Sequence, residues 1–325
     1  MDNDNSKPHW ANVSEAGSIL GIRILLTVYR LFGRSLFLLT LYPVIIYFFL
    51  FRPASRHASI QYLSRLKKQG LLTLRGPLLW LSFRHFLSFA NSILDKFIAW
   101  IGQINYADID YENLSLMMDR MDQKQGALLI ASHLGNVEVS RALTERRPQL
   151  KMTILAHTKN AEQFNRLLNE FSDSQNITIM QVSELTPASS IQLAEKIQAG
   201  EFVVVTGDRT PIESGDVTSS RRVCSVDFIG AKANFPQGPF LIGSILKCPV
   251  YMIFCIKFKK RYKIIFEPFA SAITLPRRNR EEKLQSYAQQ YAARLEHYCA
   301  IAPLQWNNFF PFWDKPGHPG TPKTL

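Results

Sequence analysis

The chain has 325 residues, a length that allows one large domain or two small ones with a buried core, so no disulfide framework is needed for stability. Its four cysteines show no CxxC spacing, which argues against a zinc ribbon and favours a reducing compartment. Lysine and arginine outnumber aspartate and glutamate by 38 to 26, a net charge of +12, and this excess favours an anionic partner such as nucleic acid, lipid head groups or an acidic carrier protein.

The first predicted element is an apolar segment. Residues Leu36 to Phe51 carry no charge, and a second apolar stretch, Ile19 to Phe32, precedes them. The first of these runs is just short of the roughly 20 residues that cross a bilayer, and Pro43 would kink such a helix. We expect a membrane-anchoring helix that spans the bilayer, with an interfacial or re-entrant anchor and a buried helix of a soluble bundle as alternatives. The segment favours lipid as the partner, and we expect no nucleic acid.

Basic residues cluster after this segment. They lie between Arg52 and Lys68 and outnumber the basic residues just before the segment. Because cytoplasmic flanks of membrane segments are enriched in Lys and Arg, this excess predicts that the chain after Phe51 is cytoplasmic. Residues 78–102, LLWLSFRHFLSFANSILDKFIAWIG, are amphipathic and rich in aromatic side chains. They predict a helix that lies against lipid or is docked on the folded domain.

From residue 124 onward, apolar runs alternate with helical patterns. Strands are predicted over 126–132, 151–157, 176–182 and 201–208. The first three are followed by predicted helices over about 135–146, 161–171 and 190–198. The remaining predictions are a strand over 222–230, a helix that opens at Phe235, a hairpin that turns at 259–261 and a last helix over about 279–299.

This order of elements predicts an α/β fold: a mostly parallel mixed sheet flanked by helices, with an N-terminal membrane-anchoring helical region. The chain divides accordingly into a disordered tail (1–15), membrane-anchoring and amphipathic helices (16–100), an α/β domain (101–313) and a second disordered tail (314–325).

The first group of chemically suggestive residues follows the strand at 126–132. His133 ends that strand, and Glu138 lies five positions later, in the first turn of the following helix. A carboxylate beside a histidine suits general-base catalysis, because it orients one imidazole nitrogen and leaves the other to accept a proton. Gly135 permits a sharp turn, and amides at the helix N-terminus suit an oxyanion. The alternative is that His133 caps the helix while Glu138 complements the helix dipole.

The second group, Gly207-Asp208-Arg209, follows the strand at 201–208. The guanidinium of Arg209 suits a phosphate, and Asp208 could orient Arg209 or the substrate. A turn with an intramolecular ion pair is the alternative. Small residues at 228–231 and 234–239 suit close approach by a long ligand, or only a tight turn and a helix start. The substrate-binding candidates are Asn136, Asp208, Arg209, Gly230, Phe235 and Gly238.

Taken in order, these segments resemble the motifs of a known superfamily. His-x4-Glu, Gly-Asp-Arg, Phe-x-Gly-Ala, Phe-Pro-x-Gly-Pro and Cys-Pro-Val resemble the successive motifs of the lysophospholipid acyltransferases, and most of all those of the bacterial lipid A late acyltransferases. The closing segment, Pro303 to Phe310, is similar to the C-terminal motif of that branch. The resemblance covers roughly residues 15–313.

The resemblance implies a function. The expected reaction is acyl transfer from a thioester donor, either acyl carrier protein or acyl-CoA, to a hydroxyl of a lipid or glycolipid acceptor, with no covalent acyl-enzyme, no metal and no cofactor. His133 would be the base, Glu138 its acidic partner and Arg209 the arginine on the phosphate side. The expected location is the bacterial inner membrane, with the catalytic domain on the cytoplasmic side.

Three positions depart from the patterns of the superfamily. Many members have Asp where this chain has Glu138, and lipid A enzymes often have Trp where it has Val137. Glycerophosphate acyltransferases typically carry a glutamate where this chain has Gln237. The missing carboxylate argues against a glycerol-3-phosphate acceptor.

Two rival functions belong to other classes. A metal-dependent hydrolase would use His133, Glu138, Asp208 and His157 as ligands, although no compact two-histidine motif is present. A non-catalytic membrane scaffold or acyl-carrier-binding protein is the second rival. Basic clusters at 221–222, 257–261 and 277–280 suit an acidic carrier protein and equally an anionic lipid surface.

Overall fold

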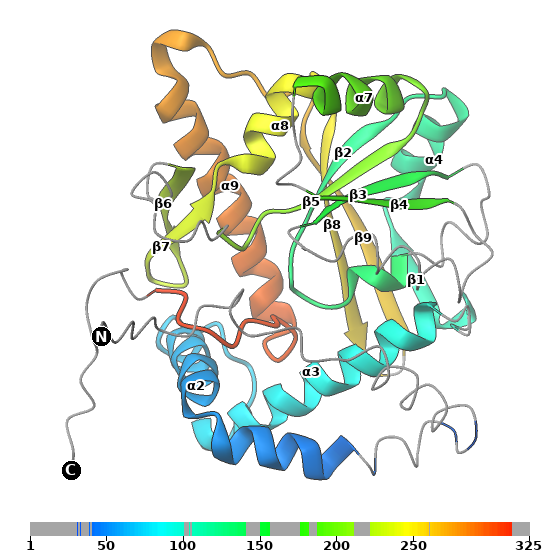
Figure 1. The fold of residues 1–325 in the computed structure, drawn as a ribbon. Helices are drawn as coiled ribbons and strands as arrows, with labels where there is room; N and C mark the ends of the chain where they lie inside the picture. The colour runs from blue at the N-terminus through cyan, green and yellow to red at the C-terminus, as the bar shows by residue number, and fades with distance from the viewer. Residues whose placement is uncertain are drawn as a thin grey trace, which may run out of the picture.

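A mixed sheet of seven strands carries the fold of the described residues (Figure 1). The computed structural model describes Leu31, Gly33, Leu39 and residues 41–100, 104, 106–140, 150–156, 176–181, 187–210, 222–259 and 261–313. The strand order is β1-β9-β8-β2-β5-β3-β4. The strands are β1 (Ile109–Glu112), β2 (Ala127–Ala131), β3 (Met152–Ala156), β4 (Ile177–Gln181), β5 (Phe202–Thr206), β8 (Val250–Phe258) and β9 (Arg261–Ala270).

Neighbouring strands run parallel except at the β8–β9 hairpin, which is antiparallel. The predicted α/β fold with a mostly parallel mixed sheet is therefore confirmed. β2 is buried along its whole length, and its side chains alternate between two hydrophobic clusters, with Leu128 and Ile130 on one face and Leu129 on the other. Helices therefore cover both faces of the sheet, as a continuous apolar strand requires.

The helices surround the sheet and cross one end of it. They are α2 (Pro53–Lys68), α3 (Leu78–Trp100), α4 (Leu114–Asp122), α7 (Pro187–Gln198), α8 (Gly238–Leu246) and α9 (Arg280–Ile301). Short 3-10 turns lie at η1 (Tyr106–Asp108), η2 (Val137–Ser140) and η5 (Arg277–Asn279). α9 buries Leu284, Ala288 and Tyr291, whose helical spacing forms one apolar stripe. In Figure 1, α2 and α3 lie together at the end of the sheet toward which β8 points.

The structure has a second sheet of two strands, and it shows that the predicted start of the helix at Phe235 is wrong. β6 (Val223–Phe228) pairs antiparallel with β7 (Ala231–Pro236) through a turn in which Ile229 and Gly230 both have positive φ. The helix predicted to open at Phe235 begins instead at Gly238. Phe235 is held in β7 because it pairs with Cys224 and is fully buried, whereas Pro239 suits the first turn of a helix.

The other strands at 126–132, 151–157, 176–182, 201–208 and 222–230, the hairpin and the last helix are confirmed to within two residues. α7 begins at Pro187, three residues earlier than predicted. The predicted helix 161–171, and residues 141–146 of the one before it, lie outside the described residues. α2, β1 and α4 were not predicted.

The N-terminal apolar segment is helical over residues 41–51. Ile45 and Phe49 pack on α3, where Phe49 meets the rings of Phe83 and Phe86 edge to face. Among the described residues, no helix combines the length and the apolar character needed to cross a bilayer. The predicted span over Leu36 to Phe51 is therefore not supported in its described part, while residues 36–38 and 40 lie outside it.

Candidate active site

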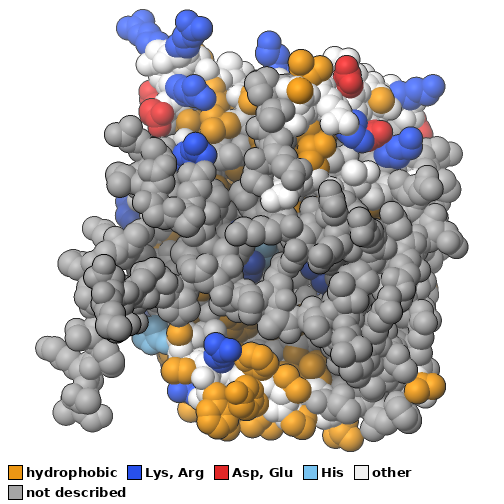
Figure 2. Space-filling model, in the orientation of Figure 1, with side chains coloured by type: hydrophobic (Ala, Val, Ile, Leu, Met, Phe, Trp, Pro, Cys, Tyr) orange, Lys and Arg blue, Asp and Glu red, His pale blue; other side chains and the backbone are white. Residues whose placement is uncertain are grey.

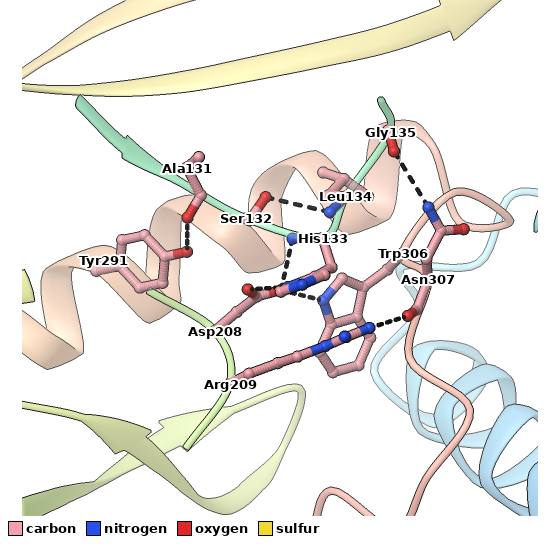
Figure 3. A network of polar contacts seen from close by, with 10 residues as sticks. All are labelled: Ala131, Ser132, His133, Leu134, Gly135, Asp208, Arg209, Tyr291, Trp306 and Asn307. Atoms are coloured by element: carbon pink, nitrogen blue, oxygen red, sulfur yellow. Dashed lines mark hydrogen bonds and ion pairs between the residues drawn. The ribbon is translucent and has the colours of Figure 1, made fainter. Parts of the chain in front are cut away.

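His133 and Asp208 meet at one edge of the large sheet (Figure 3). β2 and β5 are parallel neighbours, with Ala131 opposite Thr206, so the residues that follow them emerge side by side. His133 Nδ1 lies 2.7 Å from Oδ1 of Asp208, and the backbone N–H of His133 donates to Oδ2 at 2.8 Å. One carboxylate therefore fixes both the main chain and the ring of the histidine, although 75 residues separate the two in sequence.

A closing strap, defined here as residues 303–310, completes the environment of Asp208. Trp306 Nε1 donates to Oδ2 of Asp208 at 3.0 Å, and the carboxylate is 1% exposed. The strap is held by a short ladder: Gly135 N–H donates to the Gln305 carbonyl at 2.8 Å, and Asn307 N–H donates to the His133 carbonyl at 2.9 Å. The strap thus holds the indole against the histidine–aspartate pair.

A buried polar chain supports the strap from α2 and α3. Ser82 Oγ donates to Ser59 Oγ at 2.8 Å, Ser59 Oγ lies 2.9 Å from His85 Nδ1, and His85 Nε2 lies 2.9 Å from the Trp306 carbonyl. The carbonyl can only accept, so Nε2 carries the proton and Nδ1 accepts from Ser59. Burial lowers the pKa of His85 to about 4, against the smaller effect of its bond to Trp306, and this keeps the ring neutral.

Gly135 takes the sharp turn that its position predicted. Its φ is +72°, and a Cβ atom there would lie 1.9 Å from the Cys255 carbonyl oxygen on β8. The next amide, Asn136 N–H, donates to that same carbonyl at 2.9 Å, and Asn136 Nδ2 donates to the Ser92 carbonyl of α3 at 3.0 Å. Only glycine allows the chain after His133 to approach β8 this closely.

The backbone amides of residues 133–136 all donate within the protein. His133 donates to Asp208, Leu134 to Ser132 Oγ at 3.2 Å, and Gly135 and Asn136 to carbonyls of the strap and of β8. The sequence suggested that amides near Gly135 would stabilise an oxyanion. In this arrangement those amides already have acceptors, because the strap and β8 pair with this segment.

The electrostatics favour a neutral imidazole beside an ionised carboxylate. Burial lowers the pKa of His133, and although Asp208 opposes this effect, the pKa stays below its usual value. Burial alone would raise the pKa of Asp208, but the charge and the hydrogen bonds of His133 outweigh it and the pKa is lowered. At neutral pH His133 is therefore neutral and Asp208 ionised. Since the carboxylate accepts the Nδ1 proton, Nε2 carries the lone pair.

Arg209 lies beside this pair. Its Nη2 donates to the Asn307 carbonyl at 2.9 Å, and its guanidinium carbon lies 5.1 Å from the centre of the Phe310 ring. Burial lowers its pKa, against the opposing charge of Asp208, yet an arginine remains a cation at any working pH. Asn307 also donates from Nδ2 to the Gly135 carbonyl at 3.1 Å, which ties Arg209 and the strap to the turn after His133.

The structure assigns the position at His133 Nδ1 to Asp208 rather than to Glu138. The backbone of Glu138 lies in η2, but its side chain is outside the described residues, so its catalytic role stays a prediction. The sequence interpretation assigned Asp208 to Arg209 or the substrate and missed its bond to His133. Parallel pairing of β2 with β5 brings the two residues together. The local sequence around either residue does not indicate this pairing.

The remaining predicted binding residues lie in the unit formed by β6, β7 and α8. Gly230 is in the β6–β7 turn, and Gly238 begins α8 with open space where a Cβ would stand. Phe235 is fully buried, with its ring 5.2 Å from that of Phe228. This unit reaches the site indirectly, because Phe228 packs against Trp306 at 5.3 Å. Substrate binding by these three residues stays a prediction.

Two residues of the site were not identified from the sequence. Trp306 lies in the closing segment, which was noted as a motif without a role. Tyr291 Oη donates to the Ala131 carbonyl at 2.9 Å from α9, below the end of β2. Among the described residues, no three His, Cys, Asp or Glu side chains lie close enough to hold a metal ion, and His157 is outside that part of the chain.

A comparison with protein-family models finds a match over most of the chain. The model described as bacterial lipid A biosynthesis acyltransferase matches residues 86–315. This range contains His133, Asp208, Arg209 and the closing strap. No curated protein matches the chain.

Proposed function

Because the chain belongs to the family of bacterial lipid A biosynthesis acyltransferases, we propose that it moves a fatty acyl group from a thioester donor to a hydroxyl of a lipid or glycolipid acceptor. The observation that carries the proposal is the His133–Asp208 pair, in which a partly exposed, neutral imidazole is held by a buried, ionised carboxylate. Such a pair activates hydroxyl groups in acyl transfer.

In the proposed reaction, Nε2 of His133 takes the proton of the acceptor hydroxyl as its oxygen attacks the thioester carbonyl. Asp208 keeps the proton on Nδ1 and stabilises the imidazolium that forms. The tetrahedral intermediate then collapses, the carbon–sulfur bond breaks, and the imidazolium returns its proton to the thiolate. The products are an ester and a free thiol, and His133 ends neutral.

We assign the stabilisation of the developing oxyanion to Arg209. The amides around Gly135 already have acceptors, whereas Arg209 is a partly buried cation beside Asp208. A fixed cation in a site of low dielectric stabilises a developing negative charge more strongly than one in water. We keep Glu138 in the proposal as a second acidic residue, because it lies five positions after His133 in the sequence.

We further propose that the protein docks on the cytoplasmic face of the bacterial inner membrane through an apolar face. The face consists of Tyr42, Val44, Ile46, Tyr47, Phe48, Leu50, Phe51, Leu79 and Trp80, each between 43% and 57% exposed except Phe51 at 65%. Figure 2 shows hydrophobic side chains gathered at the lower end of the molecule, where α2 and α3 lie in Figure 1. So many exposed apolar side chains close together, on a protein with a proposed lipid substrate, support contact with a bilayer.

The experiment is a thiol-release assay on purified, detergent-solubilised protein. Acyl carrier protein and CoA thioesters are offered in turn with a membrane lipid extract, and thiol release and acylated lipid are both measured. We expect lipid-dependent release that falls by roughly 10² to 10⁴ in His133→Ala, the range for loss of a general base. The exposed His297 on α9 gives the matched control, because His297→Ala removes a histidine away from the site.

The donor that supports release identifies the thioester, and mass spectrometry of the lipids identifies the acceptor. Wild-type activity in a folded His133→Ala protein would end the assignment of the base. A protein that binds acyl donors without turnover under any of these conditions would be a membrane scaffold or an acyl-carrier-binding protein.

A further inference from the structure

The apolar face and the closing strap share one aromatic cluster. Phe86 of α3 meets the ring of Phe49 edge to face at 5.3 Å and the ring of Phe309 edge to face at 4.6 Å. Phe49 lies on the inner side of the helix over residues 41–51, whose outer side chains belong to the apolar face, whereas Phe309 belongs to the strap. Phe86 therefore lies between the surface proposed to contact the bilayer and the segment that covers Asp208.

Exposed side chains at this end of the molecule reach the cluster through direct ring contacts. Trp80, in the apolar face, stacks on Phe83 at 5.7 Å, and Phe83 packs edge to face on Phe49 at 5.3 Å. Phe89 is also exposed, and its ring centre lies 5.1 Å from that of Phe309. Packed side chains leave few voids, so they pass a displacement on to their neighbours. A displacement of the apolar face would therefore move Phe309.

His85 joins Phe309 to the carbonyl of Trp306. Its ring stacks on Phe309 with centres 4.4 Å apart and planes inclined by 30°, and its Nε2 donates to the Trp306 carbonyl at 2.9 Å. The Asn308 N–H donates to the same carbonyl at 2.7 Å, which closes a tight turn. On the other side of this turn, the Trp306 indole donates to Asp208. His85 thus contacts the strap at both ends of the turn.

The same turn contains buried polar atoms whose hydrogen bonding is incomplete. Within the described residues, Oδ1 of Asn307 and Oδ1 of Asn308 have no hydrogen-bond partner. An acceptor buried without a donor costs free energy, so the turn can gain from a rearrangement. The strap is held firmly just before it, where the side chain of Gln305 both accepts from and donates to the backbone of Lys257. A change in the strap would therefore be confined to the turn that His85 contacts.

We propose that contact of the apolar face with a bilayer orders the strap through Phe309 and His85, and thereby fixes the carboxylate that holds His133. Phe309 and His85 are then positioning residues, because each acts on the pair through the strap. The inference rests on the proposed function and adds that the bilayer controls the geometry of the site. A bilayer can do this only if it binds one state of the protein more tightly, and here the two states differ in the order of the strap.

Hydrogen–deuterium exchange measures the order of the strap without any turnover. The full-length protein is labelled with and without vesicles of anionic and zwitterionic phospholipid, and a peptide over residues 303–310 is followed by mass spectrometry. We expect its amides to exchange at least about fivefold more slowly on vesicles, the lower end of typical coupling between two sites. Equal exchange with and without vesicles, or no binding to the vesicles, would overturn the proposal.

Two variants locate the path. Phe309→Leu removes the ring that meets Phe86 and His85 but keeps an apolar side chain, and the slowing by vesicles should disappear while flotation with vesicles remains. Phe312→Leu is the matched control, because Phe312 packs on Trp306 at 4.9 Å from the side of β6 and β7. It should raise exchange of the strap in both conditions and keep the slowing. Slowing that persists in a folded Phe309→Leu protein would refute the path.

Kinetics separate positioning from simple docking. Docking brings the enzyme to its lipid acceptor and changes KM, whereas positioning of the carboxylate changes kcat. With acceptor lipid in vesicles, Phe309→Leu should lower kcat about tenfold at an unchanged KM, as expected when a hydrogen bond to a buried charge is weakened. Phe309→Tyr keeps the ring and should restore kcat. A change in KM alone would assign Phe309 to docking and overturn its positioning role.

The two measurements also distinguish this proposal from the proposed function. The exchange experiment works in the His133→Ala protein, since it needs no activity. Vesicle-dependent slowing in a protein that releases no thiol from any donor would reject the enzyme and keep the coupling. Thiol release by a protein whose strap exchanges equally with and without vesicles would keep the enzyme and reject the coupling.

Discussion

Trp306 donates its indole proton to Oδ2 of Asp208, the same oxygen that accepts the backbone N–H of His133. The other oxygen, Oδ1, faces His133 Nδ1. A residue almost at the end of the fold thus fixes the carboxylate that orients the ring of His133. His85 in turn holds the Trp306 carbonyl, so α3 supports this carboxylate through the closing strap.

Trp306→Phe tests the indole bond while keeping most of the aromatic packing against Tyr62 and Phe228. Loss of a hydrogen bond to a buried charge should lower kcat/KM about tenfold. With one donor fewer, Asp208 attracts a proton on His133 more strongly, so the acid limb of the pH–rate profile should move to higher pH. An unchanged profile together with an unchanged rate would rule out a positioning role for Trp306.

Asp208→Asn tests which carboxylate serves His133. We expect a loss of about 10² to 10⁴ in kcat, because an amide neither stabilises the imidazolium nor enforces the tautomer. The charge of Asp208 raises the pKa of His133, so its removal should move any residual acid limb to lower pH, the direction opposite to Trp306→Phe. Glu138→Gln, measured alongside, should leave the limb in place. If it is Glu138→Gln that moves the limb, Glu138 is the partner.

His85→Gln tests the buried chain through stability. The pKa of His85 is about 4 in the folded protein and about 6.5 when unfolded, so between these values the unfolded state binds more protons and stability falls as the pH is lowered. The contribution of His85 to this loss between pH 7 and pH 4 is about 3 kcal/mol.

Glutamine retains a donor for the Trp306 carbonyl but does not titrate. Chemical denaturation at several pH values should therefore show a smaller acid loss in His85→Gln by about that amount. The His297→Ala control on the surface of α9 should retain the wild-type slope.

Gly135→Ala tests the close approach of the turn after His133 to β8. The new Cβ would overlap the Cys255 carbonyl oxygen and sit on a left-handed backbone, so we expect a loss of at least about 3 kcal/mol in unfolding free energy and of activity with it. Gly70→Ala is the control, because Gly70 has φ +69° and open space around the new Cβ. Its cost should be only the conformational one, about 1 to 2 kcal/mol.

The apolar face is tested by liposome flotation. Leu50→Glu and Phe51→Glu change side chains that are 57% and 65% exposed, so folding should be preserved. Each should weaken binding to vesicles of anionic and zwitterionic lipid roughly tenfold or more, since each removes the burial of one large apolar side chain. Ile191→Glu on α7, where Ile191 is 62% exposed, is the matched control and should bind as the wild type does. Equal flotation of all variants would place the membrane contact elsewhere.

The local sequence determined the elements whose signals are local. The apolar runs at 127–131 and 202–206 are strands because their residues are apolar on both faces, and His133 and Arg209 were found because they directly follow those strands. The family was likewise readable from short motifs, and the family model matches residues 86–315. β7 was missed because Ala231–Pro236 becomes a strand only by pairing with β6, a partner that local composition does not specify.

The partners of His133 were decided only by the tertiary structure. Sequence spacing favoured Glu138 because it is five residues from His133, but proximity along the chain does not determine which carboxylate reaches the ring. Parallel pairing of β2 with β5 brings Asp208 to Nδ1 across 75 residues, and the strap adds Trp306 from near the end of the fold. These contacts depend on the strand order and on the path of the strap, and the packing of the whole domain sets both.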